Sequence, residues 1–319
     1  MPKVAVACGF FYTMPDMKAE LLAAYPDAKF APEGLNYMTK EGYIELVRGC
    51  DTVVAAIRPI LDDDLLAQLP ELKVVAQCSA GLDHIDPAAF KRRGVRVGWQ
   101  PGVNKDSVSE LALCLIIDLL RKVNTYNTML RAGQPGPREA NRLLRGRIVG
   151  IHGCGHIGQA LVKLLQPFGC KEILACDVRR FPDFYQQYGV TPVSADELYA
   201  RSEILSIHLS KNSTTRGLYT AQVLDKLKPG VLLVNTARGG IVDETALKER
   251  LKSDRIGAAA FDVFDVEPVQ DKELVALPNM LATPHIAGSA REAWVDMCRA
   301  GIRGITDNWI PEPGVYPFD

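Results

Sequence analysis

The sequence lacks both a long apolar run and an excess of one charge. The best candidate for a membrane span, residues 111–120, is interrupted by Asp118 and falls short of the roughly 18 apolar residues that a span requires. Among 319 residues, 37 Lys and Arg nearly balance 38 Asp and Glu, which gives a formal net charge of −1. Because nucleic acids and anionic membranes both select a basic protein surface, we expect neither as a partner.

The eight cysteines lack the spacing of a metal site or of a disulfide framework. None forms a Cys-x-x-Cys pair, and several lie inside apolar runs, which favours buried, reduced thiols in a reducing compartment. We therefore expect no metal site. The apolar run within residues 1–11 is too short for a signal peptide and has no small-residue cleavage site, so the expected location is cytoplasmic.

The chain also lacks repeats, and it alternates strand-like and helix-like segments almost throughout. A chain of this length exceeds the size at which one core stops growing, so two domains are expected. Strand-like runs fall in two sets, residues 3–8, 52–57, 73–76 and 95–97, then residues 147–151, 172–176, 203–207, 231–234, 256–260 and 280–282. The helical segments between them indicate βαβ units. The predicted fold is α/β, with two doubly wound parallel sheets.

Two long helices are predicted at the ends of the second set of strands. Residues 106–131 form the first and residues 290–309 the second, and residues 133–136 make the clearest break in the chain. Long helices at both ends of a domain suit a hinge.

A dinucleotide-binding fingerprint follows the first strand of the second set. The strand-like run from residue 149 continues into Gly153, Gly155 and Gly158, which provide a tight turn, backbone access for a diphosphate and close helix packing. The diphosphate would lie at the N-terminus of the next helix. Asp177, 19 residues after Gly158, can accept hydrogen bonds from the adenosine ribose. The alternative for Asp177 is a helix N-cap.

The same carboxylate favours NAD as the cofactor over NADP. A 2′-phosphate would be repelled by Asp177, although Arg179 and Arg180 are close enough in sequence to weaken that argument.

Three downstream segments contain charged or titratable side chains that suit catalysis, and each segment follows a predicted strand. They contain Arg238 (residues 234–240), Glu267 (residues 261–268) and His285 (residues 283–288). Residues just after the strands of an open parallel sheet converge on one crevice, so the three side chains should meet there. Arg238 can bind a carboxylate, His285 can donate a proton to a carbonyl oxygen, and Glu267 can orient the imidazole. Taken singly, each has an ordinary alternative as a solvated charge or a turn residue.

At these residues the chain resembles the D-2-hydroxyacid dehydrogenase family, whose members include phosphoglycerate, hydroxypyruvate and glyoxylate-reducing enzymes. Residues 81–86 and 104–110 resemble the substrate-loop and interdomain-helix signatures of that family. The resemblance implies a Rossmann cofactor domain, residues 102–286, inserted into a flavodoxin-like substrate domain made of residues 1–101 and 287–319. It also implies a homodimer.

The resemblance assigns the site residues and the reaction. Arg238, Glu267 and His285 would be catalytic in hydride transfer between NAD and a 2-keto acid or D-2-hydroxy acid. Backbone N–H groups of Ser79, Ala80 and Gly81 would bind the substrate carboxylate, and Asp262 the nicotinamide carboxamide. The whole cofactor-binding set would be Gly153, Gly155, His156, Ile157, Gly158, Asp177, Leu209, Thr236, Ala237, Asp262 and Gly288.

Two rival interpretations stay open. Formate dehydrogenases share this fold but resemble a pattern with Gln in place of Glu267, which argues against that assignment. Transcriptional corepressors of the same fold sense NADH as binding proteins, and retained catalytic residues do not exclude that role.

Arg58 suggests a class of substrate, although the sequence does not identify the keto acid. It follows the strand-like run 52–57, and a second cleft arginine would suit a substrate with a second anionic group. The aromatic loop at residues 9–12 could close over the same end of the substrate. The alternative is a solvated surface arginine held by Asp62 or Asp63.

Overall fold

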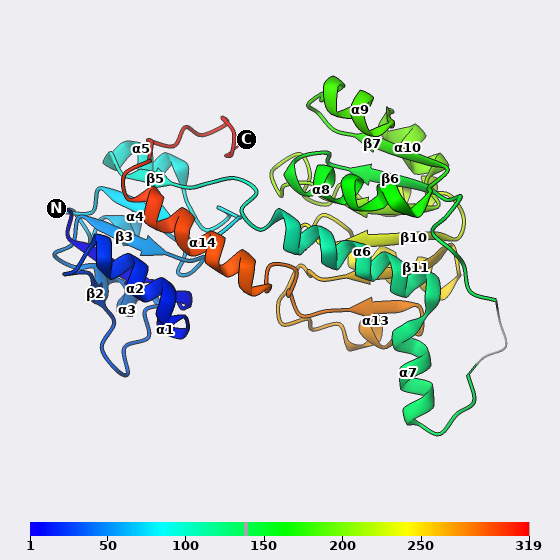
Figure 1. The fold of residues 1–319 in the computed structure, drawn as a ribbon, viewed down its shortest axis with the longest axis horizontal. Coiled ribbons are helices and arrows are strands. Elements are labelled where there is room, and N and C mark those ends of the chain that lie inside the picture. Colours follow the sequence, from blue (N-terminus) through cyan, green and yellow to red (C-terminus); the bar gives the residue numbers. More distant parts are fainter. Residues whose placement is uncertain (137–139, 319) are drawn as a thin grey trace. The chain divides into compact units, whose positions relative to one another are not determined.

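A computed structural model describes residues 1–136 and 140–318 of the chain. The protein divides into two compact units (Figure 1). The first unit contains Met1–Asn104 and Ser289–Asp319, and the second contains Lys105–Gly288.

The first unit is a five-stranded parallel sheet with the strand order β2-β1-β3-β4-β5. The strands are β1 (Val4–Ala7), β2 (Lys29–Phe30), β3 (Thr52–Ala55), β4 (Val74–Gln77) and β5 (Arg96–Gly98). One face packs on α3 (Lys40–Val47), α4 (Asp63–Leu66) and α5 (Pro87–Arg93). The other packs on α1 (Phe10–Thr13), α2 (Pro15–Ala24) and α14 (Arg291–Gly304).

The second unit is a seven-stranded parallel sheet with the order β12-β11-β10-β9-β6-β7-β8. Its strands are β6 (Ile148–His152), β7 (Glu172–Cys176), β8 (Val190–Pro192), β9 (Ile204–Ile207), β10 (Val231–Asn235), β11 (Ile256–Phe261) and β12 (Met280–Ala282). The two doubly wound sheets confirm the predicted α/β fold. Sequence reasoning missed the short strands β2 and β8, because neither contains a sustained apolar run.

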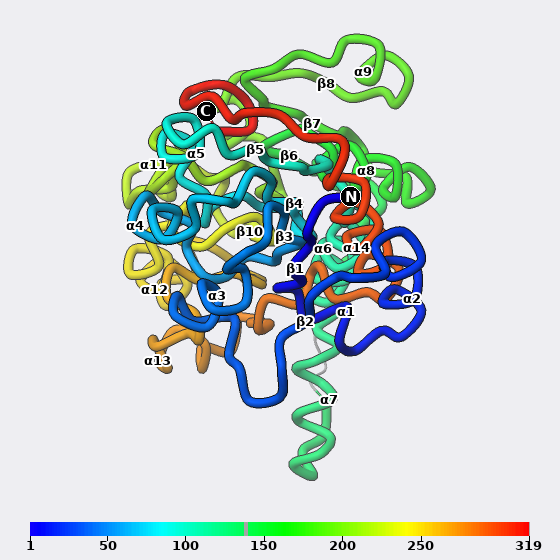
Figure 2. The backbone as a smooth tube through the Cα atoms, turned by 90° about the vertical axis from the view of Figure 1, so that its left-hand side faces the viewer, coloured from blue at the N-terminus to red at the C-terminus, as the bar shows by residue number. Residues whose placement is uncertain are grey.

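Helices cover both faces of the second sheet (Figure 2). One face packs on α6 (Lys105–Arg121), α8 (His156–Leu165) and α9 (Pro182–Tyr188), with a short 3₁₀ helix at Gln166–Phe168. The opposite face packs on α10 (Ala195–Arg201), α11 (Ala221–Lys226), α12 (Glu244–Lys252) and α13 (Lys272–Ala276). A further helix, α7 (Val123–Arg131), buries no residue.

The strand order creates a switch point between β6 and β9. The chain runs outward from β6 through β7 and β8, then returns to place β9 on the other side of β6. His152 and Asn235 are both level with Ile207 in the register of the three central strands. The loops that follow these strands therefore begin along one edge, where open α/β sheets bind ligands.

The prediction of one helix over residues 106–131 is wrong, because the chain breaks at Lys122. This residue has a φ of 53°, a left-handed conformation that interrupts the helix between α6 and α7. Asp118 stabilises the break by accepting a hydrogen bond from the N–H of Asn124 at 2.8 Å. No glycine or proline marks this position, so no local sequence signal predicts the break.

The helix predicted over residues 290–309 also ends early, at Gly304. Trp309 instead makes an antiparallel bridge to Val97, with N–H···O distances of 2.7 and 3.0 Å. The close approach of α14 to β5 requires glycine on both sides. A Cβ atom on Gly98 would lie 2.1 Å from the carbonyl oxygen of Gly304.

Within the described parts of the chain, no helix combines the length and the apolar composition that a bilayer crossing requires.

Candidate functional site

The glycine-rich loop after β6 is shaped by close backbone contacts. Gly153 has a φ of 95°, and a Cβ atom on Gly158 would lie 2.2 Å from the carbonyl oxygen of Gly153. Gly155 differs, since no atom of the described residues outside its own neighbourhood lies within 4 Å of the place that its Cβ would take. Among the described residues, no side chain caps the first turn of α8, which contains His156 and Ile157. The N–H groups of an uncapped helix N-terminus suit an anion.

Asp177 is bound to this loop through its carboxylate. Oδ2 accepts a hydrogen bond from the N–H of Cys154 at 2.7 Å, and Oδ1 accepts one from the N–H of Arg179 at 2.8 Å. It caps no helix, because α9 begins at Pro182 and has Phe181 at its N-cap. Asp177 therefore fixes the glycine-rich loop against the end of β7, and each oxygen retains capacity for a further donor.

Positive charge gathers around the same loop. Burial, together with the nearby cations Arg179 and Lys105, lowers the pKa of His156. These cations favour a negatively charged group at the loop.

The loop after β10 is organised by Asn235, which is 1% exposed. Its Oδ1 accepts a hydrogen bond from the N–H of Ala237 at 3.0 Å, and its Nδ2 donates to the carbonyl of Arg238 at 3.1 Å. The Arg238 guanidinium in turn donates to the carbonyl of Ala237 at 2.8 Å. Sequence reasoning missed Asn235, although a buried amide at a strand end was a usable signal.

Gly239 brings the Arg238 loop against the Glu267 loop. A Cβ atom on Gly239 would lie 1.9 Å from the carbonyl oxygen of Phe264. No side chain fits there, so the two backbones approach as closely as they do only because the residue is glycine.

His285 is held by Glu267 and by an unusual backbone. Its Nδ1 donates to Oε2 of Glu267 at 2.8 Å, and Oε1 of Glu267 accepts from the N–H of Phe264 at 3.0 Å. The φ of His285 is 55°, which is uncommon for a residue other than glycine and typical of functional sites.

Asp262 anchors the His285 loop. This carboxylate is fully buried, and its Oδ1 accepts hydrogen bonds from the Thr283 hydroxyl at 2.6 Å and the N–H of Ile286 at 2.8 Å. Oδ2 accepts from the N–H of Ala287 at 2.8 Å. The backbone N–H of His285 also donates to the Asp262 carbonyl at 2.8 Å. The structure thus directs the Asp262 carboxylate toward the His285 loop.

The three charged side chains influence one another's protonation. The hydrogen bond to Glu267 raises the pKa of His285, against the opposing effects of burial and of Arg238. For Glu267, burial disfavours charge, but the His285 and Phe264 hydrogen bonds and the charge of Arg238 outweigh it and lower the pKa. The structure therefore brings Arg238, Glu267 and His285 together, and Nε2 of His285 is the ring nitrogen left for a substrate.

The remaining residues of the second unit fit a dinucleotide. Thr236, after β10, has a buried hydroxyl with no hydrogen-bond partner among the described residues. Leu209 follows β9 and is half-buried, Ala237 is buried beside Arg238, and Gly288 ends the His285 loop. The unpartnered Thr236 hydroxyl and the open space beside Gly155 lie along the same edge of the sheet. A polar, extended ligand at this edge would supply the missing hydrogen bond and fill the space.

The other four predicted site residues belong to the first unit. The Ser79 hydroxyl donates to the carbonyl of Gly81 at 2.8 Å, and the indole N–H of Trp99 donates to the carbonyl of Ala80 at 3.2 Å. These bonds fix the loop that follows β4. Arg58 is exposed after β3.

Neither acid proposed as the alternative partner of Arg58 binds it. Asp62 pairs with Lys40 at 3.4 Å, and Asp63 pairs with Arg93 at 2.9 Å and Arg92 at 3.2 Å. The expectation of an aromatic loop at residues 9–12 is also wrong. Phe11 is buried in α1, and the Tyr12 hydroxyl donates to the Val6 carbonyl at 2.8 Å.

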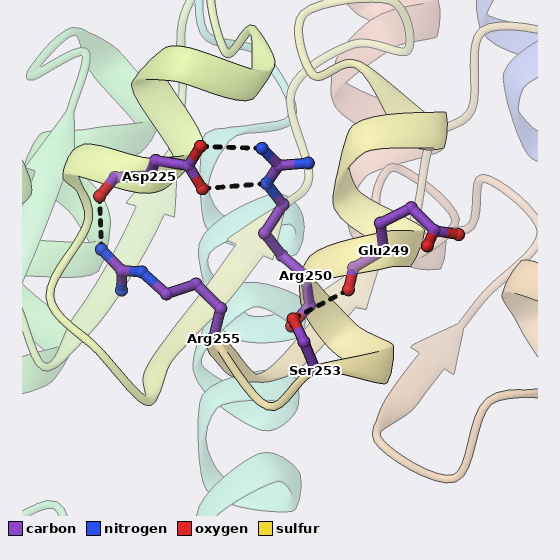
Figure 3. Close-up of a pocket in the computed structure, with 5 residues that line it drawn as sticks. All are labelled: Asp225, Glu249, Arg250, Ser253 and Arg255. Atoms are coloured by element: carbon purple, nitrogen blue, oxygen red, sulfur yellow. Dashed lines mark hydrogen bonds and ion pairs between the residues drawn. The ribbon is translucent and has the colours of Figure 1, made fainter.

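A surface hollow in the second unit lies apart from these residues in the sequence. It is lined by Asp225, Glu249, Arg250, Ser253 and Arg255 (Figure 3). Asp225 binds Arg250 through both carboxylate oxygens, at 3.0 and 2.8 Å, and the two acids balance the two arginines. The hollow therefore offers no net charge to a ligand.

Comparison with known proteins agrees with this geometry. Residues 113–287 match the NAD-binding domain of the D-isomer specific 2-hydroxyacid dehydrogenases. The chain is 32% identical to glyoxylate reductase from Thermococcus litoralis, over 84% of this chain and 81% of that protein. It is 33% identical to hydroxypyruvate reductase from Thermotoga maritima, over 81% and 84%.

Two further comparisons bear on length and fold. The chain is 36% identical to D-3-phosphoglycerate dehydrogenase from Mycobacterium leprae over 88% of its own length, but it spans only 48% of that protein. The holo structure of D-mandelate dehydrogenase from Rhodotorula graminis superposes with a TM-score of 0.84 at 26% identity, over 95% of this chain and 92% of that one.

Two glycines of the loop after β6 should respond oppositely to one added methyl group. Gly158→Ala should lower the free energy of unfolding by more than about 2 kcal/mol, because the new Cβ collides with the Gly153 backbone. Gly155→Ala should change it by less than about 0.5 kcal/mol, because the space is open. Urea denaturation of both variants measures this. Equal stabilities would show that the loop is not shaped by this contact.

The imidazole of His285 should titrate above the ordinary histidine pKa of about 6.5. In Glu267→Gln the midpoint should move to lower pH, because the carboxylate that favours the charged form is gone. NMR titration is practical because the chain has only five histidines, and His285→Ala assigns the signal. An unchanged midpoint in Glu267→Gln would refute the coupling.

Proposed function

Because the chain belongs to the D-isomer specific 2-hydroxyacid dehydrogenase family, we propose that it is an NAD-dependent oxidoreductase acting on a 2-keto acid or D-2-hydroxy acid. The observation that carries the proposal is the 2.8 Å hydrogen bond between His285 and Glu267, with Arg238 close enough to act on both. A proton donor, its orienting carboxylate and a carboxylate-binding cation are what the reduction of a keto acid requires.

Each residue has a separate task in this reaction. Arg238 binds the substrate carboxylate and polarises the carbonyl group. His285 gives a proton from Nε2 to the carbonyl oxygen, and Glu267 holds Nδ1 and favours the protonated ring. Asp262 acts as a positioning residue, because its carboxylate already accepts three hydrogen bonds from the His285 loop. Bound NAD(H) supplies the hydride chemistry.

The second unit would hold the cofactor along the edge of its sheet. Gly153, Gly155, His156, Ile157 and Gly158 would take the diphosphate and Asp177 the adenosine ribose. Leu209, Thr236, Ala237 and Gly288 would contact the nicotinamide half. The carboxylate of Asp177 favours NAD over NADP, because it would repel a 2′-phosphate.

The first unit would be the substrate domain. Backbone N–H groups of Ser79, Ala80 and Gly81 would bind the substrate carboxylate, in a loop that internal hydrogen bonds hold rigid. Arg58 would take a second anionic group, since neither Asp62 nor Asp63 neutralises it.

The protein would act as a homodimer in the cytoplasm. Helix α7 extends away from the seven-stranded sheet in both views (Figure 1 and Figure 2) and buries none of its side chains. Leu130 is 75% exposed and Val123 58% exposed, and a second copy of the chain would cover them. All eight cysteines are unpaired, which suits a reducing compartment.

A turnover assay tests the reaction. Native protein with NADH should reduce at least one member of a panel of 2-keto acids, and His285→Ala should lower kcat/KM by at least about 100-fold. Arg238→Ala should have an effect of similar size, and both variants should still bind NADH. Retained NADH binding without turnover of any keto acid by the native protein would contradict the enzyme assignment and favour an NADH-sensing binding protein.

Arg58 should select substrates with two negative charges. Arg58→Ala should lower kcat/KM about 10- to 100-fold for 2-keto acids bearing a second carboxylate, phosphate, phosphonate or sulfonate, because a charge-assisted hydrogen bond is lost. Glyoxylate and hydroxypyruvate should be reduced as before. Arg58→Lys is the matched control that keeps the charge. An equal change in kcat/KM for all the 2-keto acids tested would show that Arg58 does not bind the second anionic group.

A further inference from the structure

Two neighbouring strand ends of the second unit each present a buried polar atom without a partner. His208 follows β9 and Thr236 follows β10. The last register pair of these strands is Ile207 with Asn235, so His208 and Thr236 are next to each other, one residue further on. Among the described residues, Nδ1 of His208 and the Thr236 hydroxyl have no hydrogen-bond partner.

The two side chains lie on the same face of the sheet. Ser206 and Val234 are paired two residues earlier, and side chains of a strand return to one face every second residue. Val234 packs in the core beneath α6 and α8. His208 and Thr236 therefore lie on the α8 face, at the edge where the glycine-rich loop begins.

The backbone of His208 abuts that loop directly. Its N–H donates to the carbonyl of His152 at 2.8 Å, and a Cβ on Gly153 would lie 2.6 Å from its carbonyl oxygen. No part of the sequence fingerprint includes His208.

The other ring nitrogen of His208 is already bonded. Nε2 lies 2.8 Å from the Ser206 hydroxyl, which fixes the orientation of the ring. Burial lowers the pKa of His208 to about 3, so the ring is neutral at pH 7 and Nδ1 can serve as a single donor or acceptor.

The strand-end histidine next to it shows the contrast. His152, at the end of β6, has its Nδ1 2.6 Å from the Tyr219 hydroxyl. Nδ1 of His152 thus has a hydrogen-bond partner within the protein, whereas Nδ1 of His208 has none among the described residues.

We propose that His208 is a cofactor-binding residue, whose Nδ1 together with the Thr236 hydroxyl binds a hydroxyl or amide group of the nicotinamide half of the dinucleotide. The proposal rests on the proposed function of the second unit as the NAD-binding domain. The nicotinamide half follows from position, because Asp177 after β7 marks the adenosine side of the switch point and β9 and β10 lie on the other side.

Two substitutions separate binding from a structural role. His208→Asn keeps a polar atom at the position of Nδ1 and loses the bond to Ser206. His208→Gln keeps a polar atom near the position of Nε2 and loses Nδ1. Ser206→Ala removes the Ser206 bond alone and is the control for it.

The measurement is the dissociation constant of NADH by fluorescence, with AMP as a probe that lacks the nicotinamide half. His208→Gln should weaken NADH about 5- to 20-fold, the effect of one lost hydrogen bond, and leave AMP unchanged. His208→Asn and Ser206→Ala should bind NADH within about 2-fold of the native protein.

The opposite pattern would overturn the proposal. If His208→Gln bound NADH as the native protein does, Nδ1 would have no role in binding. If NADH and AMP weakened equally in both His208 variants, the ring would support the loop only. Failure of the native protein to bind NADH at all would instead refute the proposed function.

Discussion

The arrangement of the site depends on one buried carboxylate, that of Asp262. A carboxylate removed from water is strongly destabilising unless donors replace its hydration. Here the donors are two backbone N–H groups and one hydroxyl, all from residues 283–287. The need to satisfy Asp262 thus holds the backbone of His285 in a left-handed conformation that costs about 1–3 kcal/mol for a residue with a side chain.

The sheet then brings partners to His285. Strands β10, β11 and β12 are adjacent and parallel, so the loops that follow them start at one edge. Strand geometry alone leaves neighbouring backbones about 4.8 Å apart. Gly239 removes the remaining obstacle, since the Arg238 loop contacts the carbonyl of Phe264 where any side chain would collide. The N–H of Phe264 in turn holds Glu267. Arg238 lowers the pKa of His285 and Glu267 raises it, and the hydrogen bond that His285 donates to Glu267 has the larger effect.

The sequence predicted those parts of the structure that have a local signature. The long apolar strands, the glycine fingerprint and the three charged residues after strands all depend on spacing that can be counted along the chain. The break at Lys122 could not be predicted from spacing, because a lysine adopts the left-handed backbone conformation that is expected of glycine. Likewise, Trp309 pairs with Val97 across about 200 residues of sequence, and no local pattern reports such a bridge. A buried amide at a strand end is a signal in the sequence, but the partners of Asn235 are visible only in three dimensions. The same holds for the ring nitrogen of His208, which has no partner among the described residues.

Whether a polar atom is hydrogen-bonded within the protein also separates residues that shape the site from residues that would bind a ligand. Asp177 and Asp262 were both expected at the cofactor, yet both have their oxygens bonded to the protein's own backbone. Thr236 and His208 carry buried polar atoms that have no partner in the described part of the chain, and each such atom costs about 1–3 kcal/mol. A folded chain retains that cost where another molecule supplies the missing hydrogen bond. In this protein Asp177 and Asp262 therefore position the loops, and each oxygen of Asp177 can still accept a further hydrogen bond from a cofactor. The neutral polar residues Thr236 and His208 are further groups whose bonding a cofactor would complete.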